Sequence, residues 1–273
     1  MKSQLTKIDI EKKIFKLGSE QSWNHNILLP NGIETSPKQQ VSHGKNFVKW
    51  ERIKPILNML DLSGKRVLDI GCNEGFFSTK ISEMASYVMG GDIDTLRIKK
   101  AKFVQSILKR KNLDFEVMDI YSPEFQKQEY FDLCICMGFL HRVPDPFKAV
   151  AAISSMTDTV LFEWKVLKHG LHDEPYAYFS QKGIDKNDYY GTEYWLLSYS
   201  ALESILKRQG FKHFYRIDDP RQRRAILVAS KVDGDIFKQP DQILHRGRIP
   251  ALLSHTKRYI KTVFRIFSGR LNS

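Results

Sequence analysis

Residues 67–78 read VLDIGCNEGFFS, an apolar run that ends in an acid and then breaks into a turn with two glycines. From this stretch onward, short apolar runs alternate with segments of helical spacing. The apolar runs that we expect to form strands lie at 65–70, 86–93, 113–118, 130–137 and 158–164. Strands and helices in alternation predict a mainly parallel sheet with helices on both faces.

The chain after the fifth expected strand has a different pattern. Residues 165–198 show no clean period, and SALESILKRQG (200–210) then predicts a helix that begins at a capping box of Ser200 and Glu203 and ends at Gly210. Two further strands, at 211–218 and 223–230, flank the turn-rich DDPRQ and predict a terminal antiparallel hairpin. The expected fold is therefore α/β, a doubly wound, mainly parallel, seven-stranded sheet.

Three segments are expected along the chain. Residues 1–60 form a helical N-terminal flank, residues 61–232 form the main domain with residues 165–198 as an insertion, and residues 233–273 form a basic tail. The stretch 237–273 holds eight Lys or Arg against one acid, which supplies +7 of the net charge of +12. Its amphipathic part, 250–270, allows three interpretations: contact with an anionic membrane, contact with RNA phosphates, or docking on the domain.

Composition excludes several classes of protein. The chain of 273 residues is 42% hydrophobic and 27% charged, which is ordinary for a globular protein. Its N-terminus lacks the apolar stretch of a signal peptide, and no run approaches the roughly 20 apolar residues of a membrane span. We therefore expect a cytoplasmic protein, with peripheral contact at the inner membrane face as an open alternative. The odd number of cysteines, three, indicates reduced core thiols, without a metal site.

The turn in VLDIGCNEGFFS lies where an open parallel sheet binds its ligand, at the carboxyl end of the first strand. A dinucleotide fingerprint would need glycines at three positions of this turn, which hold Gly71, Asn73 and Phe76. Asp69 also places a carboxylate where a pyrophosphate would have to approach. These residues predict a cationic ligand.

The same residues resemble the class I S-adenosylmethionine-dependent methyltransferases, which have a Rossmann-like fold. Asp69–Gly75 matches the acid and turn of the family's first motif, with Asn73 at a usual glycine, and Asn tolerates positive φ. Asp92 fits the acid that bonds both ribose hydroxyls, and Asp119 fits the acid that contacts the adenine amine. The resemblance implies S-adenosylmethionine as the cofactor. The implied contact set is Lys49, Trp50, Asp69, Gly71, Cys72, Asn73, Gly75, Asp92, Ile93, Asp119, Ile120 and Met137.

The acceptor has to be aligned with the cofactor, so candidates follow the strands at 130–137 and 158–164. His141 is the expected general base, or else a histidine that packs over the cofactor. Glu163 is a second candidate base, or else holds a loop. The aromatic insertion is expected to cover the acceptor or to be a small satellite core. Its acceptor-binding candidates, with their neighbours, are Arg142, Trp164, Lys165, Tyr176, Tyr178, Tyr190, Tyr194 and Trp195.

A closer resemblance covers about residues 45–230 and concerns the subgroup with the tRNA wobble-uridine carboxymethyltransferases, which alkylate a uridine hydroxyl with carboxy-S-adenosylmethionine. MGFLHRVPDPFKAV and KWERIKP carry it. In that subgroup a Lys–Trp pair, a Tyr and an Arg hold the cofactor and its extra carboxylate. Lys49 and Trp50 match, Arg223 or Arg224 is a plausible Arg, and His141 stands in place of the Tyr. The missing Tyr favours plain methyl transfer.

Three functions follow from these residues. The leading one is methyl transfer to a hydroxyl or amine of a glycan-type or other small acceptor, in the cytoplasm. The second is alkylation of the wobble uridine of tRNA. The third is a non-catalytic cofactor-binding scaffold whose tail binds a membrane or RNA.

Overall fold

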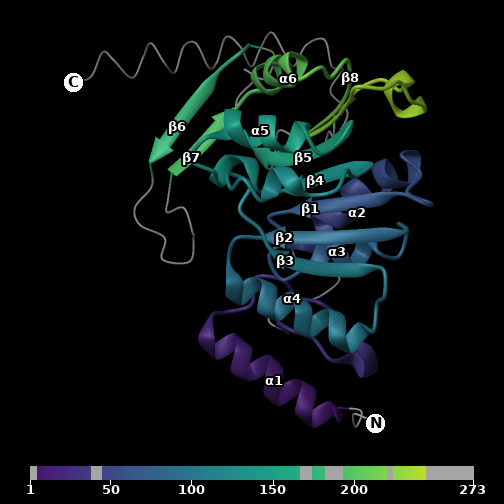
Figure 1. The fold of residues 1–273 in the computed structure, drawn as a ribbon, viewed down its shortest axis with the longest axis vertical. Coiled ribbons are helices and arrows are strands. Elements are labelled where there is room, and N and C mark those ends of the chain that lie inside the picture. Colours follow the sequence, from purple (N-terminus) through teal and green to yellow (C-terminus); the bar gives the residue numbers. More distant parts are fainter. Residues whose placement is uncertain (1–4, 38–44, 167–173, 182–192, 220–223, 244–273) are drawn as a thin grey trace. The chain divides into compact units, whose positions relative to one another are not determined.

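The computed structural model describes residues 5–37, 45–166, 174–181, 193–219 and 224–243 (Figure 1). These residues fall into two compact units. The first contains residues 1–137 with 155–158 and 234–236, and the second contains residues 138–154, 159–233 and 237–273.

The first unit is built on four parallel strands. The central strand β1 (Arg66–Ile70) pairs with β2 (Tyr87–Asp92) on one side and with β4 (Leu133–Met137) on the other, and β2 pairs with β3 (Leu113–Val117). All residues of β4 and all but the first residue of β1 and of β2 are buried. Burial along whole strands is what helices on both faces of a parallel sheet produce, and it explains the continuous apolar runs in the sequence.

Four helices belong to the first unit, namely α1 (Lys7–Glu20), α2 (Lys45–Met59), α3 (Phe76–Ile81) and α4 (Thr95–Leu108). Helix α1 begins at a capping box in which Thr6 and Asp9 each accept a backbone N–H of the other. It lies beside α4 (Figure 1), where Lys99 Nζ is 2.8 Å from Glu20 Oε2. The N-terminal flank is thus part of the unit that carries β1.

The second unit contains the predicted antiparallel hairpin. Strand β9 (Arg224–Ser230) pairs antiparallel with β8 (His213–Asp219) and with β5 (Thr159–Lys165). Its helices are α5 (Pro146–Ser154) and α6 (Tyr199–Arg208), and short 3₁₀ turns include η3 (Leu140–Arg142). The order of the strands in the sheet is β10-β8-β9-β5-β4-β1-β2-β3. The seven predicted strands are therefore confirmed, and β10 (Gln242–Ile243) adds a short edge strand that two residues could not reveal by periodicity.

Two local predictions need correction. The insertion, expected to be irregular, contains β6 (Ala177–Gln181) and β7 (Glu193–Leu197), which pair into a two-stranded antiparallel ribbon. Helix α6 is capped by Ser198 instead of Ser200, because the Ser198 hydroxyl accepts the N–H of Ala201 at 3.1 Å. Either serine could cap a helix. Because β7 ends at Leu197, the helix follows directly and Ser198 takes the N-cap position.

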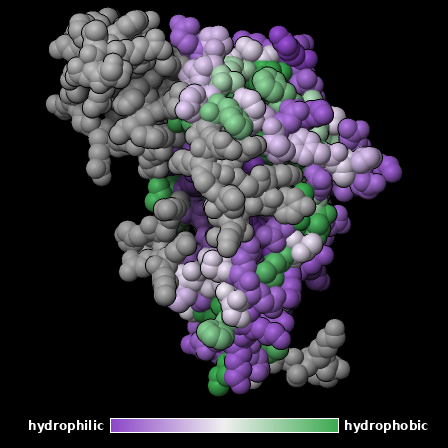
Figure 2. Space-filling model, turned by 90° about the vertical axis from the view of Figure 1, so that its left-hand side faces the viewer, coloured by the Kyte–Doolittle hydropathy of each residue, from purple (hydrophilic) through white to green (hydrophobic). Residues whose placement is uncertain are grey.

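The basic tail, including its amphipathic part 250–270, lies outside the described residues, so its role stays a prediction. In the part of the chain that the structure describes, no helix is long and apolar enough to cross a membrane. On the face shown in Figure 2, hydrophobic side chains reach the surface singly or in small groups among hydrophilic ones.

Candidate active site

The turn after β1 uses three left-handed residues in five positions. Gly71, Asn73 and Gly75 have φ values of 71°, 56° and 81°. The predicted tolerance of Asn73 for positive φ is confirmed, because Asn is one of the few side chains that enter this region readily. The amides of Gly71 and Cys72 both point to the carbonyl of Gly91, at 2.8 and 3.0 Å, which ties the turn to the end of β2.

Asp92 ends β2 and holds this turn with its side chain. Its Oδ2 accepts the N–H of Asn73 at 2.9 Å, and its Oδ1 accepts the N–H of Asp94 at 3.0 Å. The residue is 8% exposed, and burial raises the pKa of its carboxyl group. Because each carboxylate oxygen has a second lone pair, Asp92 can still accept a hydroxyl group while it holds the turn. Asp92 and the turn thus lie together, and the predicted contact of Asp92 with a ribose stays a prediction.

Asp69 is the buried acid of the motif. Its Oδ2 accepts the hydroxyl of Ser78 at 2.5 Å, while its Oδ1 has no hydrogen-bond partner among the described residues, and neither has Oδ1 of Asn73. Burial raises the pKa of Asp69 from its ordinary 3.8 to about 7, with a smaller contribution from the charge of Asp92. A buried acceptor of this kind favours a ligand that brings a positive charge or N–H donors.

Behind the turn, Glu74 fastens the N-terminal segment. Its carboxylate accepts the N–H groups of Asn24 and His25 at 3.0 and 3.1 Å and lies 3.7 Å from Nζ of Lys100. Both charged side chains are fully buried. Lys100 also donates to the carbonyls of Gln21 and Ser22, at 2.7 and 3.1 Å. The segment 21–25 is thus held to the turn by two buried charges that sequence reasoning missed.

The other predicted cofactor residues also lie in the first unit. Trp50 on α2 is 5% exposed and Lys49 is half-buried. Burial lowers the pKa of His25 to about 3, and the positive charge of Lys49 contributes to this, which places Lys49 in electrostatic range of the segment behind the turn. Asp119 follows β3, where its Oδ1 accepts the N–H of Tyr121 at 2.9 Å. Ile120 and Met137 are buried, and Ile93 is half-buried.

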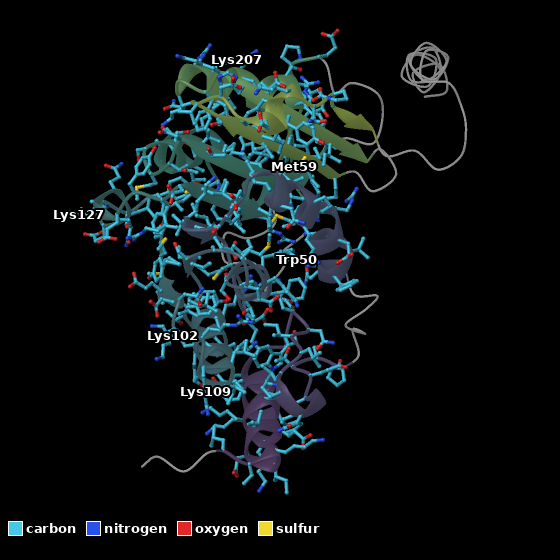
Figure 3. All side chains as sticks on the ribbon, turned by 90° about the vertical axis from the view of Figure 1, so that its right-hand side faces the viewer. Trp50, Met59, Lys102, Lys109, Lys127 and Lys207 are labelled. Atoms are coloured by element: carbon cyan, nitrogen blue, oxygen red, sulfur yellow. The ribbon has the colours of Figure 1, made fainter. Side chains whose placement is uncertain are left out.

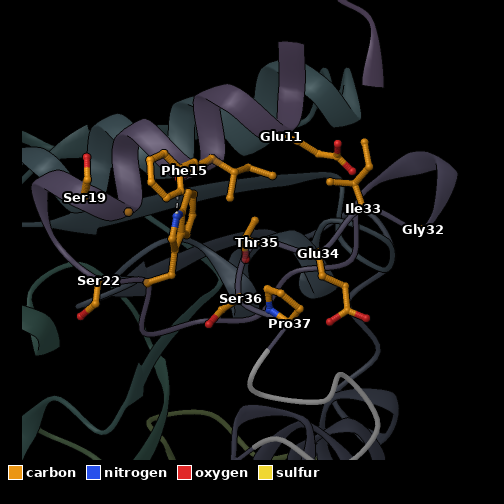
Figure 4. Close-up of a pocket in the computed structure, with 13 residues that line it drawn as sticks. Glu11, Phe15, Ser19, Ser22, Gly32, Ile33, Glu34, Thr35, Ser36 and Pro37 are labelled. Atoms are coloured by element: carbon orange, nitrogen blue, oxygen red, sulfur yellow. Dashed lines mark hydrogen bonds between the residues drawn. The ribbon is translucent and has the colours of Figure 1, made fainter. Parts of the chain in front are cut away.

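A cleft of about 650 Å³ lies between α1 and residues 32–37 (Figure 4). Trp23 lines it, and the indole is held by a hydrogen bond from Nε1 to the carbonyl of Ile14 at 3.1 Å. Nζ of Lys100 lies 5.1 Å from the centre of the same ring. The cleft contains none of the residues that the sequence assigned to the cofactor or the acceptor, so it is separate from the predicted site.

In the second unit, His141 lies in η3 and is 1% exposed. Its Nδ1 accepts the backbone N–H of Lys165 at 3.4 Å. A neutral imidazole that accepts at Nδ1 carries its proton on Nε2, and therefore donates there. This arrangement favours a hydrogen-bond donor over the predicted general base.

Glu163 and Arg224 form an ion pair on neighbouring strands. Arg224 Nη1 lies 3.3 Å from Glu163 Oε2, and Glu163 is 1% exposed. Trp164 next to it is fully buried, donates from Nε1 to the carbonyl of Leu197 at 2.9 Å and packs edge-on against Tyr199. Trp164 therefore fits a core residue that holds the ribbon better than a residue that touches an acceptor.

The ribbon carries the remaining acceptor candidates. Tyr178 is 50% exposed, Trp195 is half-buried, and Tyr176 is half-buried at the base of the ribbon. Arg142 and Lys165 are also half-buried. Tyr190, Arg223 and the side chain of Tyr194 lie outside the described residues, so their assignments stay predictions.

Comparisons with known proteins agree with the turn and the fold. A family model described as a methyltransferase domain matches residues 61–160. The tRNA U34 carboxymethyltransferase of Campylobacter hominis is 30% identical over 210 residues, which cover 74% of this chain and 70% of that protein. The chain belongs to the class I S-adenosylmethionine-dependent methyltransferases. Within this class it resembles the tRNA U34 carboxymethyltransferases.

Two other similarities cover different shares of the chain. The tRNA U34 carboxymethyltransferase of Campylobacter fetus subsp. fetus is 30% identical over 116 residues, and the match spans 42% of this methyltransferase and only 39% of the relative. The N-terminal domain of EvdMO1, solved in the presence of SAH and D-fucose, has a TM-score of 0.66 at 14% identity and covers 83% of this chain and 97% of that domain. The second similarity shows a shared fold.

The residues of the first unit fit S-adenosylmethionine, the cofactor of this class. The cofactor carries an ammonium group, a sulfonium group and a ribose diol. The turn offers two buried acceptor oxygens that have no hydrogen-bond partner among the described residues, on Asp69 and Asn73, and the carboxylate of Asp92. Acceptors matched to a cation and a diol are what such a cofactor requires.

The methyltransferase also contains contacts that the sequence did not reveal. Glu74 belongs to the first motif, but the sequence indicated no contact for its side chain. Lys100 lies in a helix rich in lysine, where the sequence did not distinguish it from its neighbours. A charged residue inside a buried turn, such as Glu74, is a signal that could have indicated a buried partner, because charged residues are seldom fully buried unless they are paired.

Proposed function

We propose that this methyltransferase alkylates a uridine of tRNA. The observation that carries the proposal is the match to the C. hominis relative, which extends over 74% of this chain and 70% of that protein. The net charge of +12 supports an anionic macromolecular substrate. Lys102 and Lys109 on and just after α4 are exposed examples of this charge (Figure 3).

Four of the candidate residues have a role in the proposed reaction. Bound S-adenosylmethionine supplies a methyl group on a sulfonium, which is an activated leaving group. Asp92 would hold the ribose hydroxyls, and Asp69 with Asn73 would accept N–H donors of the ammonium group. His141, with its proton on Nε2, would donate a hydrogen bond to the acceptor and orient it.

The group transferred is proposed to be methyl instead of carboxymethyl. A cofactor with an extra carboxylate needs an uncompensated cation to bind it. Arg224, one of the two candidates from the sequence, lies 3.3 Å from the carboxylate of Glu163, which already compensates its charge. The other candidate, Arg223, lies outside the described residues. His141 also stands where the carboxymethyl-transferring relatives have a Tyr. Both features support a cofactor without the extra carboxylate.

The test is direct analysis of modified tRNA. Purified protein is incubated with unmodified and native tRNA and either S-adenosylmethionine or its carboxylated form, and the nucleosides are identified by mass spectrometry. We expect a new methylated uridine derivative, its loss in Asp92→Asn, and a steep fall in tRNA binding with salt. Transfer from the carboxylated cofactor alone would refute the choice of methyl, and no modified nucleoside with either cofactor would refute the tRNA substrate.

A second candidate is methyl transfer to a hydroxyl of a sugar or other small acceptor. The EvdMO1 domain was solved in the presence of D-fucose, and it shares the fold over 83% of this chain. With labelled S-adenosylmethionine and a cell extract, label in the small-molecule fraction and none in RNA would favour this candidate over the first.

A further inference from the structure

The ribbon of β6 and β7 presents two different faces. Its register places Phe179 opposite Trp195 and Tyr178 opposite Leu196. Because successive side chains of a strand point to opposite faces, Phe179 and Trp195 share one face and Tyr178 lies on the other. The rings of Phe179 and Trp195 are tilted by 60° with centroids 5.1 Å apart.

The Phe179–Trp195 face is exposed although it is aromatic. Phe179 is 44% exposed, and Trp195 is half-buried. Trp164 and Tyr199 in the same unit make a similar ring contact at 5.1 Å, but both are fully buried. Packing of the core explains the buried pair of Trp164 and Tyr199. The pair of Phe179 and Trp195 instead leaves aromatic surface exposed to solvent, and a planar ligand can bind to this surface.

This face is held in a defined place in the second unit. Trp195 donates from Nε1 to the carbonyl of Pro144 at 3.0 Å, and β7 packs against η3, which contains His141. His141 is in turn held by the backbone N–H of Lys165. One side chain thus links the aromatic face to the loop that carries the candidate hydrogen-bond donor. The hydrogen bond from Trp195 to Pro144 therefore fixes the position of the ribbon relative to this loop.

We propose that the Phe179–Trp195 face stacks a pyrimidine base of the substrate RNA. The inference rests on the proposed tRNA substrate and specifies which surface receives it. Stacking suits this face because every base has a π-face and aromatic side chains bind bases without requiring a particular hydrogen-bond pattern. The link through Pro144 would place the stacked base at a constant offset from His141.

An exposed ring elsewhere in the second unit supplies the control. Phe147 lies on α5, outside the ribbon, and is 51% exposed, against 44% for Phe179. Phe179→Ser and Phe147→Ser therefore remove the same ring, at similar exposure, from two elements of one unit. We expect Phe179→Ser to raise the KM for tRNA roughly tenfold with unchanged affinity for S-adenosylmethionine. Phe147→Ser should stay within about twofold of the parent protein, and Phe179→Trp should retain tRNA binding.

A second measurement separates this inference from the proposed function. Trp23, Trp50 and Trp164 are buried, so a short uridine oligonucleotide is expected to quench mainly the fluorescence of Trp195. Quenching that Phe179→Ser weakens and Phe147→Ser preserves supports the stacking face even if no tRNA is modified. In that case only the proposed transfer fails. Equal effects of the two variants on quenching and on KM overturn the inference, even if tRNA is modified.

Discussion

The turn after β1 and the ribbon of β6 and β7 are built by different means. The turn is defined by backbone conformation and by buried carboxylates on two neighbouring strands, because Gly71, Asn73 and Gly75 supply the left-handed positions and Asp69 and Asp92 supply the acceptors. The ribbon is defined by register and by hydrogen bonds to distant segments, such as that from Trp195 to Pro144. The first kind of site is visible in a sequence, and the second depends on tertiary structure.

The largest effect is expected at the tertiary contact that supports the turn, the buried pair of Lys100 and Glu74. Lys100→Met leaves the carboxylate of Glu74 buried without its cation, so we expect the free energy of unfolding to fall by about 3 to 5 kcal/mol. Urea denaturation measures this. Lys99→Met is the matched control, because Lys99 is one residue away and its pair with Glu20 is at the surface, so its effect should be small. Equal losses in the two variants would contradict a structural role of the buried pair.

The next prediction concerns the local part of the turn. Asn73→Val forces a β-branched residue to a φ of 56°, which costs about 1 to 3 kcal/mol, and should weaken binding of S-adenosylmethionine by roughly tenfold or more. Asn73→Gly has no such strain and loses only the Oδ1 acceptor, so it should bind more weakly than the parent protein and more tightly than Asn73→Val. Calorimetric titration of both variants gives the comparison. Equal losses in the two variants would instead assign the whole effect to the amide side chain.

Acidification should weaken cofactor binding through Asp69. Its folded pKa of about 7 lies above the ordinary 3.8, so this group contributes to the stability of the cofactor-free protein most fully below pH 3.8, and the contribution is lost as the pH rises through about 7. A cationic ligand needs the ionised form. We expect the dissociation constant of S-adenosylmethionine, measured by calorimetric titration, to rise about tenfold per pH unit below about 7.

Asp69→Asn separates this effect from other titrating groups. The variant should bind more weakly than the parent protein at about pH 8 and show a flatter pH dependence from there down to about pH 6. If it shows the slope of the parent protein, a different group controls binding.

The smallest expected effect tests the ribbon side of the comparison. Ser198 caps α6 and also accepts the N–H of Tyr176 at 3.1 Å, so Ser198→Ala should lower the free energy of unfolding by about 1 to 2 kcal/mol. Ser200→Ala, two residues away, should change it little. Thermal denaturation of the pair decides which serine begins the helix, and a larger loss in Ser200→Ala would restore the cap that the sequence suggested.

The sequence predicted a large part of this protein. Alternation of apolar runs and helical segments was enough to place seven strands, because a strand buried on both faces must be apolar throughout. The turn after β1 could also be predicted, since positive φ favours Gly or Asn at its positions, and the acids at strand ends lie where parallel strands meet a ligand. The family followed from these same few residues.

Only the tertiary structure decided which side chains these elements bring together. The partners Glu74 and Lys100 lie 26 residues apart, and Trp195 and Pro144 lie 51 residues apart. No local period records such pairs, because a hydrogen bond or an ion pair depends on the final position of two segments. The same holds for His141, whose type suggested a base. The backbone N–H of Lys165 points to its Nδ1, and that contact exists only in the folded chain.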